Sequence, residues 1–356
     1  MIVVVGLKND IDRIIEESSR KLHQISIPPV RCWLLDGVLN KSREDAAFQN
    51  ALAECERYPP RVKLLKTLRE DGTWPISKQR MAEEDAGPGP PFGWTSTAIL
   101  RNLYLLYEYF TPPGTGYTDE AIEKIFEWQH EDGYIMGSEQ DMLPRPARNG
   151  LAMCVLYRFK KERDPRVDRL VQWIINGQRH DGGWNIPYLQ DARYRDEYKH
   201  MPVDDFITKV KSGEVAPCTA DESRRIPSCI WSTLGALRGL NWSDSHRQDM
   251  KFKPGGDFVL DNFFKRNYHT NFYYSEKNWT MLKFPVYYGS GLTAIDCLEY
   301  MGFGPDDPRM EKAVRWLISM RRNDGFWYRS MRPHMIDDQW ITVTALMILA
   351  FYSRMY

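Results

Sequence analysis

The segment QRHDGGW (178–184) decides the fold of this chain, because its Asp-Gly step, followed within two residues by an aromatic residue, occurs four times. The other copies are LREDGTW (68–74), QHEDGYI (129–135) and MRRNDGFW (320–327). In each copy we expect the glycine at a helix end, since glycine enters the left-handed backbone region at little cost. The recurrence of one turn along the chain indicates a repeat architecture.

Amphipathic helices precede these turns. Apolar residues ahead of Gln178 recur in steps of three and one, which places them on a single helical face; they are Val167, Leu170, Val171, Ile174 and Ile175. The segments DPRV (164–167) and DPRM (307–310) fit helix starts, with Asp as N-cap and Pro as the first helical residue. These helices are predicted to be half-exposed.

A second kind of segment alternates with the first and is apolar on nearly every side, as buried helices are. Its members are PPVRCWLLDGVLN (28–40), GWTSTAILRNLYLLYEYF (93–110), RPARNGLAMCVLYRF (145–159), PSCIWSTLGALRGL (227–240), YYGSGLTAIDCLEYMGF (287–303) and DDQWITVTALMILAFY (337–352). The alternation predicts an all-α protein, a single α/α toroid over 1–356 with about six inner and five to six outer helices. The amphipathic segment 9–23 supplies an outer helix that closes the ring, and only residues 2–5 look like a strand.

Composition narrows the function. Lys+Arg and Asp+Glu are both 48 of 356 residues, and this neutral balance argues against a nucleic-acid binder. No run of 18 apolar residues exists, so no integral membrane segment is expected. The start of the chain lacks a basic leader, which favours the cytoplasm, where the six separated cysteines would be free thiols. Aromatic residues reach 13% and are typical of pocket walls.

One connection is unusually long. The polar segment 185–225 lies between the turn at 178–184 and the next predicted inner helix, and it contains a short helical patch at 204–211. Long connections in compact domains are usually functional or disordered. We interpret this insertion as a lid over a central cavity.

The turn at 178–184 resembles the QW motif of squalene–hopene and oxidosqualene cyclases through Gln178, Asp181, Gly182 and Trp184. With the alternating helices, the chain resembles the superfamily of squalene cyclases and protein prenyltransferase β-subunits, especially its small single-toroid members. The resemblance implies a toroid with a central cavity and an isoprenoid or other apolar small-molecule substrate. The motif residues themselves are expected to be structural.

Class II cyclases of that superfamily use an Asp-x-Asp-Asp motif, whose middle Asp protonates an alkene or epoxide. Here Met335-Ile336-Asp337-Asp338 matches it without the first Asp. By this resemblance Asp337 is the catalytic acid, Asp338 its anionic neighbour, and His334 a group that tunes or reprotonates it. The alternative is that Asp338 caps a helix and Asp337 favours its N-terminus.

Other residues near the starts of inner helices are candidates for substrate binding. Aromatic faces stabilise carbocations, and cations would hold an anionic group. The aromatic candidates are Trp94, Trp231, Tyr287, Tyr288 and Trp340, and the cationic ones are Arg148, Arg225 and Arg332. The alternatives are core packing for the aromatics and solvated loops for the arginines.

A zinc site is the competing prediction. Cys218, Cys229 and His269 could supply three ligands and leave an open catalytic position.

The sequence leaves three hypotheses for the function, and protonation-initiated cyclisation without a cofactor is the first. The second is a zinc-dependent, prenyltransferase-like or hydrolytic enzyme, and the third a non-catalytic toroid that binds a lipid or peptide. The sequence leaves the oligomeric state open.

Overall fold

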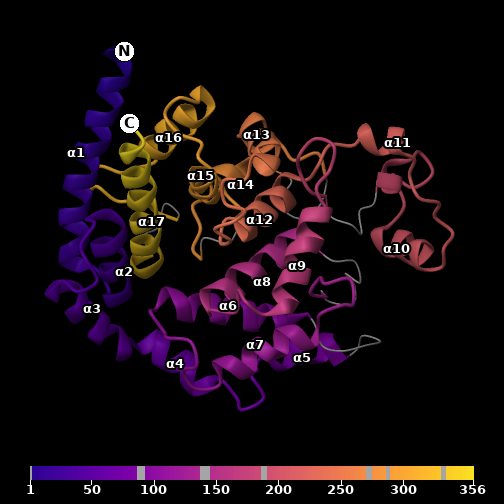
Figure 1. Ribbon diagram of the computed structural model, residues 1–356, viewed down its shortest axis with the longest axis horizontal. Helices are drawn as coiled ribbons and strands as arrows, with labels where there is room; N and C mark the ends of the chain where they lie inside the picture. Colours follow the sequence, from indigo (N-terminus) through magenta and orange to yellow (C-terminus); the bar gives the residue numbers. More distant parts are fainter. Residues whose placement is uncertain are drawn as a thin grey trace.

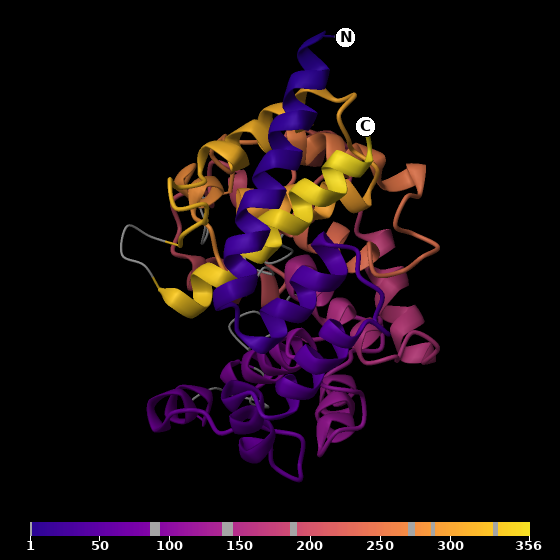
Figure 2. The same ribbon diagram turned by 90° about the vertical axis from the view of Figure 1, so that its left-hand side faces the viewer.

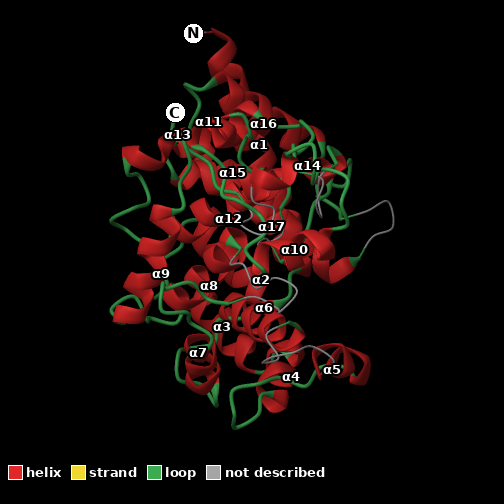
Figure 3. Cartoon of the chain, turned by 90° about the vertical axis from the view of Figure 1, so that its right-hand side faces the viewer, coloured by secondary structure: helices red, strands yellow, loops and turns green. Residues whose placement is uncertain are grey.

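Helices make up the regular secondary structure of the computed structural model (Figure 3), which describes residues 2–85, 93–136, 145–185, 191–269, 275–285, 289–329 and 334–356. Within these ranges the only β-type pairing is an isolated bridge between Gln129 and Ile135. The helices that form the inner ring are α2 (Pro28–Trp33), η1 (Leu34–Val38), α6 (Trp94–Glu108), α8 (Pro146–Arg158), α12 (Ile230–Leu240), α15 (Gly291–Tyr300) and α17 (Met335–Arg354).

The remaining helices lie around this ring or between its members. They are α1 (Ile2–Ile25), α3 (Ala46–Glu56), α4 (Pro59–Thr67), α5 (Lys78–Asp85), α7 (Thr118–Glu127), α9 (Pro165–Asn176), η4 (Asp191–Tyr194), α10 (Val203–Lys211), α11 (Ala220–Arg224), η5 (Met250–Phe252), α13 (Lys253–Asp261), α14 (Lys277–Thr280) and α16 (Pro308–Ser319). The outer helices α7, α9, α13 and α16 each pack against the inner helix that precedes them in the chain.

The inner helices form a closed ring (Figure 1). Along it α8 contacts α6 and α12, α15 contacts α12 and α17, and α17 contacts α2 and η1. The ring closes between α2 and α6, where the Trp33 indole Nε1 donates a hydrogen bond to the carbonyl of Glu108 over 3.1 Å. The predicted α/α toroid is confirmed, as is the alternation of buried and half-exposed helices.

Helix α1 completes the outer layer. It lies along α17, and the first and last helices of the chain are side by side in Figure 2. An ion pair of 3.0 Å joins Glu17 to Arg321 after α16, and the Lys21 ammonium donates to the carbonyl of Asp324. The predicted closing role of 9–23 is confirmed. The strand-like run at residues 2–5 is instead the start of this helix.

Two inner helices approach unusually closely because glycines line their contact. A Cβ on Gly235 would lie 2.4 Å from the Ala147 Cα, and one on Gly239 would lie 2.8 Å from the Gly150 Cα. These contacts advance together along α8 and α12, so the two helices run in the same direction. Small residues therefore set the diameter of this side of the ring.

The four Asp-Gly turns have the expected geometry. Gly72, Gly133, Gly182 and Gly325 all have φ between 77° and 99°. The Gln178 side-chain amide donates to the carbonyls of Gly182 (3.0 Å) and Lys251 (3.2 Å), which ties this turn to the next repeat. The indole N–H of the buried Trp184 donates a hydrogen bond to the carbonyl of Ile174 over 2.6 Å.

The insertion forms a small unit of its own. Ala192, Phe206 and Val215 are buried together and pack with Cys218. Helix α10 confirms the predicted helical patch. In Figure 1, α10 and α11 lie at the right, on the outer side of α9 and α12 and away from the centre of the ring. The described residues of 185–225 are therefore not placed as a lid. No described helix has both the length and the apolar character needed to cross a bilayer.

Candidate functional site

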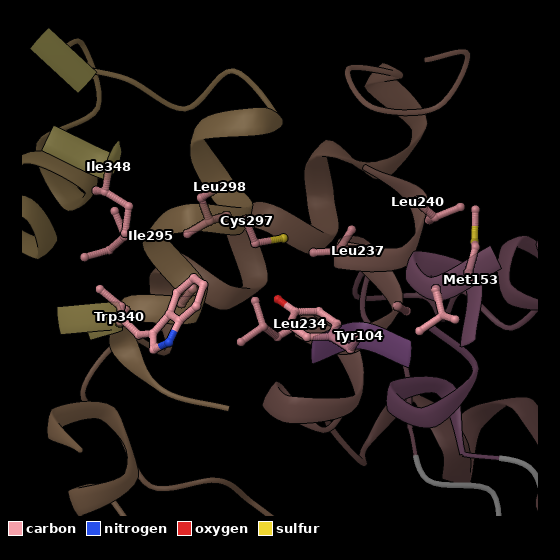
Figure 4. Packing of buried hydrophobic residues seen from close by; sticks show 14 of the residues in the cluster. Tyr104, Met153, Leu234, Leu237, Leu240, Ile295, Cys297, Leu298, Trp340 and Ile348 are labelled. Carbon is pink, nitrogen blue, oxygen red and sulfur yellow. The ribbon is translucent and has the colours of Figure 1, made fainter. Parts of the chain in front are cut away.

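A cavity of about 230 Å³ lies inside the ring. The inner helices α2, α6, α8, α12, α15 and α17 contribute to its wall, and Figure 4 shows Tyr104, Cys297 and Trp340 converging from three of them. Two neighbouring lining residues, Tyr300 at the end of α15 and Arg247 after α12, are exposed by 38% and 36%, and we call this exposed part of the wall the mouth. The wall also includes Trp33, Glu108, Arg158, Arg238, Asn241, Trp242, Phe284, Asp296, Val343, Thr344 and Met347.

The last turns of α6 and α8 bring a buried ion pair to the wall. Arg158 Nη1 lies 3.0 Å from Glu108 Oε1, and both side chains are almost completely buried. The guanidinium also lies 4.0 Å from the ring centre of Tyr104 and 4.7 Å from that of Trp242. These aromatic faces and the carboxylate together compensate the buried charge. Arg158 is thus held rigidly by its surroundings.

A looser ion pair joins the end of α12 to the middle of α15. Arg238 Nη2 lies 3.7 Å from Asp296 Oδ2, beyond hydrogen-bond distance. The Asp296 side chain is 25% exposed, and Asp296 is one of the residues that line the cavity. Burial raises the pKa of Asp296, although Arg238 and Arg158 act in the opposite direction. Asp296 is therefore a carboxyl that can hold a proton and still contact a ligand.

A stacked aromatic pair forms another part of the wall. Phe284, ahead of α15, stacks on Trp340 of α17 with ring centres 4.6 Å apart and an interplanar angle of 9°. Trp33 of α2 also lines the cavity, and it hydrogen-bonds to the carbonyl of Glu108. Glu108, Arg158 and Arg238 come from the C-terminal ends of their helices, whereas Phe284 precedes α15 and Trp340 lies near the start of α17. We call the Phe284–Trp340 stack the aromatic part of the cavity, and the two ion pairs with Tyr104 and Trp242 its charged part.

The predicted acids occupy the start of α17. The Asp338 carboxylate is buried and accepts hydrogen bonds from the backbone N–H groups of Arg329 (3.0 Å) and His334. Asp337 forms an ion pair of 2.8 Å with Arg329, and His334 is the exposed N-cap residue. These three residues lie together, but the cavity wall among the described residues does not include them. Their geometry is that of a helix start that anchors the preceding loop.

The predicted aromatic residues separate into three environments. Trp340 lines the cavity. Trp231 packs on Trp279 with ring centres 4.7 Å apart, and Trp94 lies under the Arg80 guanidinium at 4.2 Å. Tyr287 and Tyr288 lie outside the described residues.

The predicted cations are dispersed. Arg148 hydrogen-bonds to Ser96 and, over 3.4 Å, to Thr97 of α6. Arg225 is exposed at the end of α11 in the insertion, and Arg332 lies outside the described residues. No described residue of this group reaches the cavity wall.

The three residues of the zinc hypothesis are engaged elsewhere. His269 uses both ring nitrogens, one with the Pro227 carbonyl at 2.8 Å and the other with the Tyr194 hydroxyl. Cys229 accepts a hydrogen bond from Asn267, and Cys218 packs in the core of the insertion. Among the described residues no three His, Cys, Asp or Glu side chains form a cluster suited to a metal ion.

Sequence reasoning missed the charged part of the cavity. Glu108, Arg158, Arg238 and Asp296 are among the few charged residues of helices that are predicted to be buried. A charged residue at such a position is almost never fully buried without a partner, and this was the available signal. It could not show that four separate helices bring these residues together.

Comparisons with known proteins give distant structural similarities. No family model matches the chain, and no curated protein matches its sequence. A type II terpene cyclase from Scytonema, solved in complex with its product merosterolic acid A, is 13% identical. The similarity covers 86% of this chain and 98% of that one, with a TM-score of 0.33. A protein from Actinoplanes is 14% identical over 85% of this chain and 99% of its own, with a TM-score of 0.31.

Proposed function

We propose that this protein is an enzyme that protonates a carbon–carbon double bond of a small apolar chain and so starts its cyclisation. The observation that carries the proposal is the Asp296 carboxyl, which faces an aromatic-walled cavity and whose pKa is raised by burial. A carboxyl in such surroundings takes up a proton more readily than an ordinary surface carboxyl does. It can therefore act as a general acid.

The reaction needs no cofactor. The Asp296 O–H bond breaks, its proton forms a new C–H bond, and the electron pair of the alkene moves to that bond. The cation left on the neighbouring carbon is attacked by a second double bond of the same chain, which closes a ring. Loss of a proton from an adjacent carbon then ends the reaction, so the product is an isomer of the substrate.

The aromatic part of the cavity supports this chemistry. The faces of Trp340 and Phe284 attract a cation without donating electrons to a covalent bond. Arg158 and Arg238, which would repel a cation, lie with their carboxylates in the charged part. The new cation is thus expected near α17, and the acid at α15.

The size of the cavity limits the substrate. A cavity of ~150 Å³ holds one benzene ring, so 230 Å³ accommodates roughly nine or ten non-hydrogen atoms. This matches an acyclic isoprenoid of about ten carbons better than a squalene-sized chain. Geraniol and geranic acid are therefore suitable test substrates.

The test is turnover of geraniol and geranic acid in deuterium oxide, with products separated and their masses measured. A cyclic product that carries one deuterium on carbon is expected. Asp296→Asn should abolish its formation, whereas Asp337→Asn, which changes the acid predicted from the sequence, should leave it. If Asp337→Asn abolishes the reaction and Asp296→Asn does not, the acid is Asp337. Tight binding without any deuterated product would show a binding protein instead.

A further inference from the structure

The charges around the cavity are balanced pair by pair. Arg158 is compensated by Glu108 at 3.0 Å, and Arg238 by Asp296 at 3.7 Å. At the mouth, Arg247 lies 3.1 Å from the exposed Asp244. The internal arginines have no spare carboxylate among the described residues of the wall.

Protonation of Asp296 disturbs this balance. The acid form of Asp296 carries no charge, so the Arg238 guanidinium would lose the carboxylate at 3.7 Å, while the Tyr104 hydroxyl and Glu108, which also pairs with Arg158, still interact with it. The Arg238 side chain is only 11% exposed. A buried cation that loses its counter-ion is strongly destabilised. The form of the site that can donate a proton therefore requires a new negative charge beside Arg238.

We propose that the substrate supplies this charge: it is an unsaturated chain with a single carboxylate, which replaces Asp296 as the counter-ion of Arg238. The inference rests on the proposed function, since it names the substrate class of the same site. When the substrate carboxylate binds, the Arg238 guanidinium pairs with it in place of Asp296. The Asp296 carboxylate then takes up a proton from solvent. Substrate binding thereby creates the acid that the reaction uses.

The choice of a carboxylate follows from charge and shape. One anionic charge restores the balance that one protonation removes, whereas a phosphate dianion would add a second. The planar guanidinium of Arg238 matches a carboxylate through two parallel hydrogen bonds. Arg247 at the mouth adds a positive charge on the path of an entering anion.

Other groups also face Asp296, and they affect its protonation. They come from α8, α12 and α15 and are Arg158, Cys154, Arg238, Cys297, Glu299 and Tyr300. Only the two arginines favour the charged form of the carboxyl. An anion that neutralises Arg238 therefore favours proton uptake by Asp296. Arg158 stays paired with Glu108 in this step, so its effect on the pKa of Asp296 does not change.

The experiment measures binding rather than turnover, so it is independent of whether the reaction occurs. Geranate and geraniol share one carbon chain and differ in the charge of the head group. Their dissociation constants are measured by calorimetry from pH 6 to 8, in two buffers with different ionisation enthalpies. Thermal unfolding of each variant shows whether it is folded.

Geranate should bind at least tenfold more tightly than geraniol at pH 6, and its binding should take up a proton. Linkage of one proton weakens geranate binding by up to about tenfold for each unit of rising pH. Asp296→Asn removes the internal competitor, so it should bind geranate more tightly than the unmodified protein at pH 8, without proton uptake. Arg238→Gln should lose the preference for geranate while still binding geraniol, and Arg238→Lys should restore part of that preference.

Equal affinities for geranate and geraniol would overturn the proposal. So would weaker binding of geranate to folded Asp296→Asn at pH 8. Neither result depends on catalysis, because the deuterium experiment alone decides whether Asp296 donates a proton to the chain.

Discussion

Arg238 and Asp296 form an ion pair within the wall of the cavity, with 3.7 Å between Nη2 and Oδ2, one from the end of α12 and the other from the middle of α15. The separation brings the charges close without a hydrogen bond between them. Such a pair holds the carboxyl in place while leaving its oxygens accessible to a proton and a ligand. The proposed acid and the proposed carboxylate site both follow from this one relationship.

Breaking the buried ion pair between Arg158 and Glu108 should strongly destabilise the protein. In Arg158→Met the Glu108 carboxylate keeps its burial but loses its cation, which should cost about 3–5 kcal/mol of unfolding free energy. Urea unfolding measures this loss. The double variant Arg158→Met/Glu108→Gln removes both charges and should recover most of the stability. A double variant as unstable as the single one would show that the aromatic contacts of Arg158, rather than the ion pair, carry the effect.

Stability should fall as pH rises through the titration of Glu299. This side chain is 3% exposed, Oε1 has no hydrogen-bond donor among the described residues, and burial raises its pKa well above the ordinary value. The folded state therefore keeps a proton that the unfolded state releases above about pH 4.5. Stability is greatest below that value and is lost toward the folded-state pKa.

Glu299→Gln should weaken this dependence, of which the raised pKa of Asp296 leaves a part, and raise the unfolding free energy at pH 8 by on the order of 1 kcal/mol. The gain should shrink as the pH approaches 4.5. Thermal unfolding at pH 8 and pH 5 measures both effects. Glu120→Gln on the exposed face of α7 is the control and should change neither value. A Glu299→Gln protein with the pH profile of the unmodified chain would contradict the assignment.

The contact between α8 and α12 should not tolerate a methyl group. A Cβ on Gly150 would lie 1.9 Å from the Gly235 carbonyl oxygen, which belongs to rigid backbone. Gly150→Ala is expected to cost about 1–3 kcal/mol or more, since the helices must separate. Gly6→Ala in α1, with nothing within 4 Å of the new Cβ, should be neutral or slightly stabilising. Equal thermal stabilities of the two variants would show that the ring widens freely.

The zinc hypothesis has its own test, elemental analysis of protein purified without a chelator or a metal-affinity tag. Well under one zinc per chain is expected, because both ring nitrogens of His269 are hydrogen-bonded. One zinc per chain that disappears in Cys218→Ala would mean that the insertion rearranges to form the site. In that case hydrolytic or transferase activity should be assayed in place of cyclisation.

The sequence by itself determined the helices and their two classes. Apolar periodicity, Asp-Pro starts and Asp-Gly ends are local signals, and each acts within a few residues of the structure it specifies. The segments 93–110, 145–159 and 337–352 thus became α6, α8 and α17. Their alternation with half-exposed helices also implied the ring, because each inner helix needs neighbours on all sides.

Only the tertiary structure decided which charges share the cavity. Glu108, Arg158, Arg238 and Asp296 are far apart in the chain, and nothing in the sequence distinguishes them from other charged residues of the same helices, such as Arg101 and Glu299. The sequence drew attention to Asp337 and Asp338 because they are adjacent. In the structure the Asp338 carboxylate accepts a backbone hydrogen bond from Arg329, and Asp337 forms an ion pair with the Arg329 side chain, both at the start of α17. Convergence depends on the rotation and direction of each helix around the ring, which packing between helices sets and no local pattern records.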